Sequence, residues 1–241
     1  MSKPLAGRLA LVTGGAERVG RDICVALAEA GADIVVNHRN QPDAAAETAS
    51  RIAALGRRAM LAEADVTDAD AVARMFATHP VDLLVNSAAT FVQAPFLDLT
   101  AKQWDTSMGA ILKGAFLCTQ SAARGMLARG FGRIANIAGI SVYESWPDYV
   151  SHAVAKSALV KLTECAALAL APTVQVNCVA PGTLILNAGD VHAAVETPVR
   201  GATPARGTPD DLARTLVFLF SGPAYLSGAT IPLDGGRRLA R

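Results

Sequence analysis

The sequence lacks an excess of either charge and lacks long apolar runs, and each absence excludes a class of protein. Its 22 Lys and Arg residues are balanced by 21 Asp and Glu, which leaves a formal net charge of +1. That balance argues against the basic surface that nucleic-acid binding requires. The longest apolar stretches, such as residues 165–171, are far shorter than the ~20 residues needed to span a bilayer. Residues 1–7 contain no apolar segment typical of a signal peptide, so we do not expect secretion.

Paired cysteines are also missing. Cys24, Cys118, Cys165 and Cys178 show no spacing typical of a disulfide framework or a metal site. All four occur in apolar segments, which predicts thiols in the core of a protein from a reducing compartment. We therefore expect a cytoplasmic protein with no bound metal.

Apolar residues, in contrast, are abundant. They make up 51% of the 241 residues, so most of the chain must be buried in a large core or packed against another subunit. Short apolar segments alternate with helical ones along the whole chain. The expected strands are residues 9–12, 33–37, 59–65, 81–86, 132–138, 174–179 and 229–233, and the expected helices are 21–30, 42–56, 68–77, 100–129, 148–171 and 208–220. This alternation predicts one α/β domain over residues 1–241, a doubly wound, Rossmann-like parallel sheet of seven strands with helices on both faces.

Residues 184–208 break this alternation. Gly, Pro and Ala interrupt them, and their periodicity is poor. A segment of this kind late in a doubly wound fold is a candidate lid over a substrate. Because it has no clear pattern, the sequence leaves the substrate pocket undefined.

Residues 9–20 carry the first functional pattern. The apolar run of residues 9–12 ends in a turn that contains Gly14, and an amphipathic segment follows. A buried strand, a tight turn and a helix start present backbone N–H groups and a helix N-terminus to a phosphate. The turn is not specific by itself, because its spacing is not G-x-G-x-x-G.

Together with its companions, this turn resembles the nucleotide-binding motif of the short-chain dehydrogenase/reductase family. The motifs that carry the resemblance are Thr13-Gly14-x-x-x-Arg18-x-Gly20, Asp65, Asn86-Ser87-Ala88-Ala89, Lys156, Pro181-Gly182, Ser227-Gly228 and Asp234-Gly235-Gly236. They occur in the family's order and spacing and cover the whole chain. Arg18, where most members carry glycine, and His38-Arg39 make the sequence most similar to the pteridine-reductase branch.

The resemblance implies a dinucleotide site. Gly14 and Gly20 would let the backbone approach a pyrophosphate, and Arg18 would add positive charge there. His38 stands where NAD-preferring relatives carry an acidic residue, and Arg39 can bind a 2′-phosphate bidentately, so NADP(H) is favoured over NAD(H). The alternative is that Arg39 is merely solvated at a strand end. The implied cofactor-binding residues are Gly14, Arg18, Val19, Gly20, His38, Arg39, Asp65, Val66, Asn86, Ala88, Lys156, Pro181 and Gly182.

Two of these residues have a second interpretation or a distinct role. Asp65 resembles the family residue that contacts adenine, although an Asp at a strand end also serves as a helix cap. Asn86 resembles the residue that stabilises the central strand beside the cofactor. Both remain predictions of the resemblance.

The family's catalytic pattern is incomplete in this sequence. Members combine Tyr-x-x-x-Lys on one helix with a serine in the preceding loop and an asparagine on the preceding long helix. Lys156 matches the lysine, but His152, Gly139 and Ile111 occupy the tyrosine, serine and asparagine positions. Ser141, two residues after Gly139, would need a shifted loop to replace the serine.

The substitution of tyrosine by His152 changes the chemistry. A neighbouring Lys⁺ lowers a tyrosine pKa from about 10 toward neutrality, which helps that residue to act as an acid or base. The same charge on Lys156, four residues along one helix face, disfavours the imidazolium form of His152. A neutral His152 could hydrogen-bond a substrate oxygen as an electrophile.

Aromatic residues near these positions have two interpretations each. Phe91 follows the Asn86 turn, where an aromatic residue of the pteridine-reductase branch stacks a flat substrate, or it anchors the loop. Tyr143 and Trp146 either line a substrate pocket or pack against a neighbouring subunit. Tyr149 lies roughly 10 Å along the helix from Lys156, too far for the usual tyrosine–lysine pair.

Three functions fit this pattern. The first is an NADP(H)-dependent oxidoreductase that transfers hydride to a small carbonyl, quinone or pterin-like substrate. The second is a catalytically impaired member that serves as a nucleotide-binding or assembly subunit. The third is a lyase or isomerase in which His152 acts as a base. The long helices at 101–129 and 148–171 are apolar on more than one face, which together with the resemblance predicts a homodimer or homotetramer, with no nucleic-acid or membrane partner.

Overall fold

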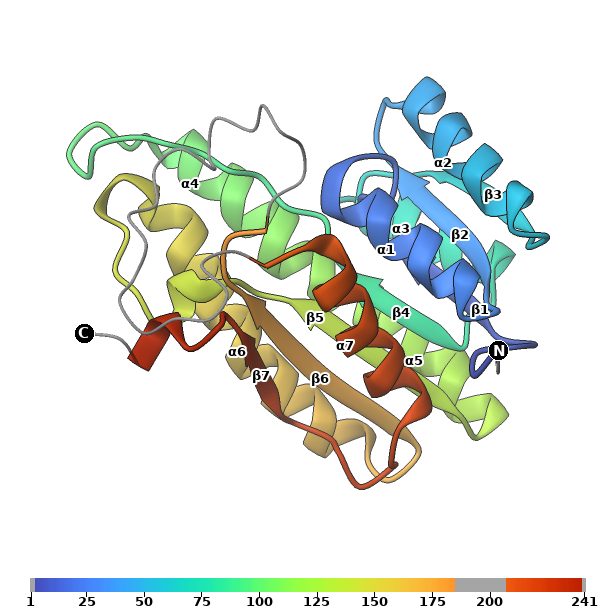
Figure 1. Cartoon of the computed structure of the whole chain (residues 1–241). Coiled ribbons are helices and arrows are strands. Elements are labelled where there is room, and N and C mark those ends of the chain that lie inside the picture. The colour runs from blue at the N-terminus through green and yellow to red at the C-terminus, as the bar shows by residue number, and fades with distance from the viewer. Residues whose placement is uncertain (1–2, 185–206, 240–241) are drawn as a thin grey trace.

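The computed structural model describes residues 3–184 and 207–239, and these form a sheet of seven parallel strands between two layers of helices (Figure 1). The strand order is β3-β2-β1-β4-β5-β6-β7. This confirms the predicted doubly wound architecture. The candidate lid at 184–208 falls outside the described residues except at its ends, where Leu184 and Gly207 form an isolated bridge.

The strands match the predicted apolar segments closely. Their bounds are β1 (Leu9–Val12), β2 (Asp33–His38), β3 (Ala59–Glu63), β4 (Leu83–Asn86), β5 (Gly132–Ile137), β6 (Val174–Pro181) and β7 (Thr230–Leu233). Strands β4, β5 and β6 are buried along their whole length, as expected for parallel strands covered on both faces. The chain order reverses between β1 and β4, and the carboxyl ends of strands at such a switch point form a ligand-binding crevice.

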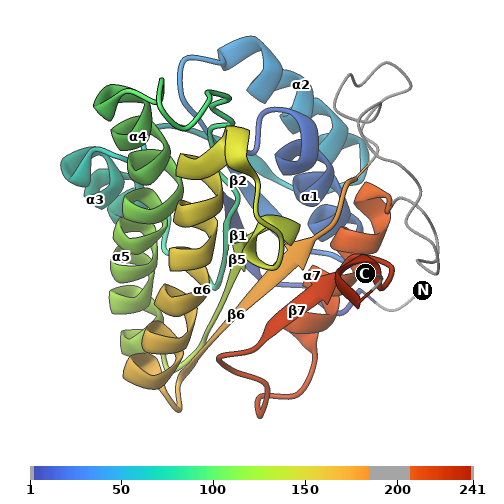
Figure 2. The same ribbon diagram turned by 90° about the vertical axis from the view of Figure 1, so that its left-hand side faces the viewer.

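The helices divide into two layers. Their bounds are α1 (Arg18–Glu29), α2 (Pro42–Ala54), α3 (Ala69–Thr78), α4 (Ala101–Ser107), α5 (Gly114–Arg129), α6 (Val150–Leu170) and α7 (Pro209–Ser221). Figure 2 shows α1, α2 and α7 on one side of the sheet and α3 to α6 on the other. One buried apolar cluster fills each side, with Leu27 and Leu216 in the first and Met75 and Met126 in the second.

The long helix predicted at 100–129 is present but is not α-helical throughout. A π-helical turn, η1 (Met108–Lys113), separates α4 from α5. Thr100 caps α4 in a capping box with Gln103, as its sequence position indicated. Gly114 begins α5 where a Cβ atom would lie 2.6 Å from Val66, so the helix here packs unusually close to the loop after β3.

All four cysteines are free thiols, but the predicted burial is wrong for one of them. Cys24, Cys118 and Cys178 are buried, whereas Cys165 is exposed on the outer face of α6. Burial raises the pKa of Cys118 to about 12 and that of Cys178 to about 11. Within the described ranges, no helix has the length and apolar character needed to cross a membrane.

Candidate functional site

The turn after β1 is fixed by contacts that only glycine permits. Gly14 has a φ of +64°, and a Cβ atom there would lie 3.2 Å from the Cα of Ala88. A Cβ atom at Gly20 would lie 2.0 Å from the Gly14 carbonyl oxygen. Arg18, at the head of α1, has a φ of +51°, the left-handed region that glycine adopts most easily. The backbone therefore keeps the family's tight turn with an exposed cation at its tip.

Side-chain hydrogen bonds tie this turn to the neighbouring strands. Thr13 Oγ1 accepts from the amides of Ser87 and Ala88 at 2.9 and 3.0 Å. Asn37 Oδ1 accepts from the Gly14 amide at 3.3 Å, while its Nδ2 donates to two carbonyls of the β3 segment. Sequence reasoning missed Asn37, although a polar residue in an otherwise apolar strand was the available signal.

Arg39 and Asp65 face each other at the ends of β2 and β3. Arg39 Nη1 lies 3.1 Å from Asp65 Oδ2, and the Arg39 side chain is 59% exposed. Asp65 Oδ1 accepts from the amide and hydroxyl of Thr67. Burial opposes ionisation of Asp65, but these hydrogen bonds and the Arg39 charge outweigh it and lower the pKa of the carboxyl. Asp65 does not cap the next helix, because Asp68 accepts from the first amides of α3 instead.

His38 is buried, and its Nδ1 accepts from the Gln41 amide at 3.4 Å. The imidazole therefore helps to form the bend that carries Arg39. Because this residue is a histidine, no carboxylate stands where NAD-preferring relatives carry an acidic residue. Pro181 and Gly182 end β6, where the Gly182 amide donates to the Leu233 carbonyl at 2.9 Å. Val66 is buried, whereas Val19 and Ala88 are half-buried.

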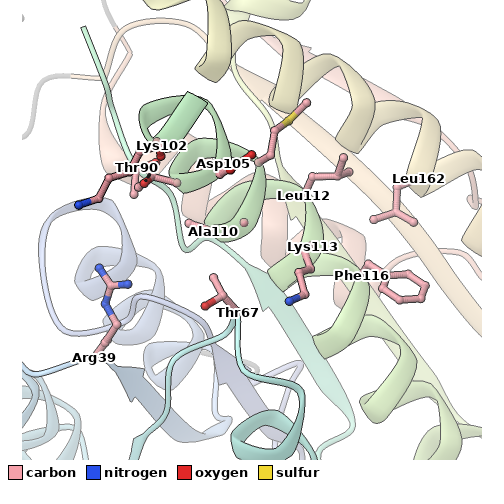
Figure 3. Close-up of a pocket in the computed structure, with 13 residues that line it drawn as sticks. Arg39, Thr67, Thr90, Lys102, Asp105, Ala110, Leu112, Lys113, Phe116 and Leu162 are labelled. Atoms are coloured by element: carbon pink, nitrogen blue, oxygen red, sulfur yellow. Dashed lines mark hydrogen bonds between the residues drawn. The ribbon is translucent and has the colours of Figure 1, made fainter. Parts of the chain in front are cut away.

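A cavity of about 1070 Å³ adjoins this end of the sheet. Figure 3 shows Arg39 and Thr67 on one side of it and the η1 turn, with Lys113, on the other. Thr90 also lines the cavity, and the Thr90 carbonyl contacts His152. Arg39 therefore lines this cavity directly, whereas His152 adjoins it only through Thr90.

Buried amides link the central strands to the helices behind them. Asn86 Nδ2 donates to Asn136 Oδ1 at 2.8 Å and to Thr119 Oγ1 at 3.1 Å. Asn136 Nδ2 in turn donates to Thr163 Oγ1 on α6 at 2.9 Å. Asn86 Oδ1 is buried and has no hydrogen-bond partner within the described part of the chain.

His152 is held in one tautomer. Its Nδ1 lies 3.0 Å from the Thr90 carbonyl oxygen, which can only accept, so Nδ1 carries the proton. Burial and the Lys156 charge lower the pKa of His152 to about 4, and the Thr90 hydrogen bond only partly offsets them. At neutral pH the ring is therefore uncharged, and Nε2 carries the lone pair.

Two aromatic rings, those of Trp146 and Phe91, pack against His152. The Trp146 ring lies nearly parallel to the imidazole, at an angle of 7° and a centroid distance of 6.3 Å. Phe91 meets the imidazole edge-on at 4.7 Å and packs against Tyr149 at 4.4 Å. Trp146, Tyr149 and Phe91, together with His152, form one aromatic cluster.

Lys156 lies one helical turn after His152 and is fully buried. Its ammonium group donates to the Ile137 carbonyl oxygen at the end of β5. Burial lowers the pKa of Lys156 to about 8, although the nearby Cys178 acts in the opposite direction. Lys156 is therefore charged at neutral pH but releases its proton far more easily than an exposed lysine.

The other two atypical positions differ in what replaces the missing side chain. Ile111 is buried in an apolar cluster with Ala155 and Leu159 of α6, so no polar atom takes the asparagine's place there. Near Gly139, however, a Cβ atom would lie 3.8 Å from Ser141 Oγ. That hydroxyl is buried and lacks a hydrogen-bond partner among the described residues. The loop thus brings Ser141 beside the position of the family's serine.

Known proteins share this architecture along the full chain. A family model described as enoyl-(acyl carrier protein) reductase matches residues 14–238. A short-chain type dehydrogenase/reductase of Picea abies is 34% identical, with 97% of this chain and 93% of that protein covered.

Two solved structures are similarly close. One, provisionally assigned as a short-chain alcohol dehydrogenase of Sinorhizobium meliloti, has a TM-score of 0.93 and 34% identity, with both chains covered completely. Another, provisionally assigned as an NAD(P)-dependent gluconate 5-dehydrogenase of Beutenbergia cavernae, has a TM-score of 0.91 and 32% identity over the full length of both chains. That structure contains NADP at low occupancy.

Proposed function

The chain belongs to the short-chain dehydrogenase/reductase family, and from this premise we propose that it is an NADP(H)-dependent oxidoreductase acting on a small carbonyl, quinone or pterin-like substrate. The observation that carries the proposal is the glycine turn with two cations, Arg18 and Arg39, at its edges. The related structure with bound NADP supports the same cofactor. When bound, the nicotinamide supplies or accepts the hydride.

The residues of the turn fit a dinucleotide. Gly14 and Gly20 permit the tight turn at the N-terminus of α1, where a pyrophosphate would bind, and Arg18 adds charge at the same place. Arg39 would bind the 2′-phosphate in exchange for Asp65. An ion pair exposed to this degree contributes at most about 1 kcal/mol, so a phosphate competes with it readily.

His152 and Lys156 differ in whether they accept or donate a proton. With its proton fixed on Nδ1, neutral His152 offers Nε2 to a substrate O–H or N–H and cannot donate to a carbonyl oxygen. This argues against the electrophile role suggested by the sequence. Lys156 is the better proton donor, because its pKa of about 8 lies near working pH. The unpaired Ser141 hydroxyl is a second group that can hydrogen-bond a substrate oxygen.

The aromatic cluster favours a flat substrate. Phe91 is 47% exposed and borders Trp146, Tyr149 and His152, and aromatic clusters of this kind bind flat rings by stacking or edge-to-face contact. This supports the pteridine-reductase branch over relatives that act on small aliphatic carbonyls.

Arg39 provides the test of cofactor choice. In a fluorescence titration, we expect NADPH to bind at least about tenfold more tightly than NADH, and Arg39→Ala to remove that difference. Arg58→Ala is the matched control, because Arg58 forms an exposed ion pair with Asp33 at the opposite, amino ends of the same two strands. Equal affinities of the wild type for the two cofactors would overturn the role of Arg39.

A second candidate function is a nucleotide-binding subunit with little or no turnover. The burial of Ile111 against α6 favours this candidate, because no polar side chain at that position can take the role of the family's active-site asparagine. NADPH oxidation should be screened over carbonyls, quinones and pterins. A silent wild type, together with turnover in His152→Tyr/Gly139→Ser, would establish this candidate instead. A base-catalysed lyase or isomerase reaction at His152 would show turnover that does not depend on NADPH oxidation.

Self-association through α5 and α6 is part of the proposal. These two helices lie side by side on the outside of the sheet (Figure 2). Phe116 on α5 and Val154 and Leu168 on α6 are exposed. Exposed apolar side chains on neighbouring helices are typical of a subunit interface. We expect a homodimer or homotetramer in light scattering. The four free thiols agree with a cytoplasmic protein.

A further inference from the structure

The segment after β7 contacts the loop that leads into α6. Arg237, in the short helix η5 (Arg237–Leu239), donates from Nε and Nη2 to the two carboxylate oxygens of Glu144 at 2.8 and 2.9 Å. Both side chains are largely shielded from solvent, with exposed fractions of 21% and 24%. Bidentate pairs of this kind are stronger and more directional than single contacts.

Glu144 also binds the tryptophan beside His152. Trp146 Nε1 donates to Glu144 Oε2 at 3.1 Å. Its indole then lies parallel to the His152 ring and edge-on to Phe91. An uninterrupted series of contacts therefore runs from Arg237, through Glu144 and Trp146, to His152.

The backbone holds Arg237 in place for this contact. Asp234 accepts from the amides of Gly236 and Arg238, and Gly235 and Gly236 both have positive φ angles. Gly182 lies so close that a Cβ atom there would be 3.2 Å from the Cα of Asp234. The turn that carries Arg237 is thus packed on the end of β6.

We propose that Arg237 is a positioning residue that, through Glu144, holds the Trp146 indole over His152 and so shapes the substrate side of the site. The proposal rests on the proposed function only in placing the substrate beside His152. Without Arg237, the half-buried Glu144 carboxylate keeps only the Trp146 indole as a side-chain partner within the described part of the chain. The carboxylate then gains hydration by turning toward water. The indole then loses its fixed acceptor. Lysine is an incomplete replacement, because a single ammonium group cannot hold both carboxylate oxygens.

The test uses the full-length protein and follows the indole N–H resonances by ¹H–¹⁵N NMR. Trp104 is the other tryptophan of the chain, so a Trp104→Phe variant assigns the two signals. We expect Arg237→Ala to shift or broaden the Trp146 signal and leave the Trp104 signal unchanged. The pKa of His152 should rise from about 4, because water reaches the ring. Arg237→Lys should give a smaller change and covers the case in which the alanine variant fails to fold.

Two further variants sharpen the result. Glu144→Gln keeps an acceptor for the indole but removes the charge, so its Trp146 signal should change less than in Arg237→Ala. Arg214→Ala is the control, because Arg214 forms an exposed pair with Asp210 on α7, and it should change neither signal. An unchanged Trp146 signal and an unchanged His152 titration in folded Arg237→Ala or Arg237→Lys would overturn the proposal.

Measurements of NADPH binding and oxidation distinguish a failure of the Arg237 positioning role from a failure of the proposed function. In an active protein, Arg237→Ala should raise KM about tenfold with a smaller effect on kcat, since it disturbs substrate placement. NADPH affinity should not change. If the Trp146 signal responds but NADPH neither binds nor is oxidised by the wild type, the positioning role stands and the proposed function fails. If NADPH is oxidised and the signal does not respond, the reverse holds.

Discussion

The two ends of the candidate site depend on different features, one on the shape of the main chain and the other on a few side chains. At the β1–α1 end the constraint is the backbone, because Gly14 has a positive φ and Gly20 has no room for a Cβ atom. At the α6 end the proposal depends on side chains, because Lys156 matches the family's lysine whereas His152, Gly139 and Ile111 stand where the resemblance predicts tyrosine, serine and asparagine. Holding a nucleotide depends on main-chain shape, whereas acid–base chemistry depends on a few side chains. The second can therefore change while the first persists.

The largest expected effect is at the backbone-constrained end. Gly20→Ala places a Cβ atom 2.0 Å from the Gly14 carbonyl, and main-chain atoms cannot move aside easily. We expect the free energy of unfolding to fall by on the order of 3 kcal/mol and NADPH binding to be lost. Chemical denaturation and a fluorescence titration measure the two effects.

Gly56→Ala is the matched control for that change. Gly56 also has a positive φ, +73°, but a Cβ atom added there would have no other atom within 4 Å. The substitution should cost only the backbone penalty of about 1 kcal/mol and leave NADPH binding intact. If both variants behave alike, close approach at Gly20 is not what shapes the turn.

Much of the backbone-constrained end could be predicted from sequence, because the strand, the glycines and the helix start are local signals. The bounds of β1 and the parallel sheet of seven strands followed from the apolar segments. The π-helical turn at Met108–Lys113 could not be predicted in the same way. It accompanies the close packing of Gly114 against Val66, a contact between segments far apart in sequence.

The α6 end shows the same limit for side chains. The motif identified Lys156 and His152, and their spacing predicted the depressed pKa of the histidine. The tautomer was not predictable, because it depends on the Thr90 carbonyl, which reaches His152 from a different loop. Glu144 and Arg237 were missed for the same reason, since nothing in either local sequence indicates the other.

The next prediction concerns pH and the buried histidine. The pKa of His152 is about 4 in the folded protein and about 6.5 in an unfolded chain, so the unfolded state binds the proton first as pH falls. This histidine therefore costs no stability above about pH 6.5, and its penalty grows to about 2–3 kcal/mol as pH falls to about 4. Lys156 contributes no change over this interval, because its pKa of about 8 lies above it.

His152→Asn isolates that contribution. Its side-chain amide can still donate to the Thr90 carbonyl but does not titrate in this range. Urea unfolding at pH 7 and pH 4.5 should show that the wild type loses about 2 kcal/mol more than the variant. Equal losses would mean that the pKa of His152 is not lowered by folding, and the α6 end would then hold a second proton donor besides Lys156.

The smallest effect is expected at Ser141. There a single variant allows the free energy of unfolding to be compared with activity. Its hydroxyl is buried without a hydrogen-bond partner in the described ranges, and such a group destabilises a folded protein by roughly 1 kcal/mol or more. Ser141→Ala should therefore raise the free energy of unfolding by about 1 kcal/mol. If the hydroxyl binds a substrate oxygen in place of the family's serine, the same variant should lower kcat/KM by about tenfold or more at unchanged NADPH affinity.

Ser157→Ala on α6 is the control, because it removes an exposed hydroxyl bonded to the Ala153 carbonyl and should change neither the free energy of unfolding nor kcat/KM. A stabilised but fully active Ser141→Ala would leave the α6 end with Lys156 and His152 alone, since gaining stability without losing activity is the outcome for a residue that only packs.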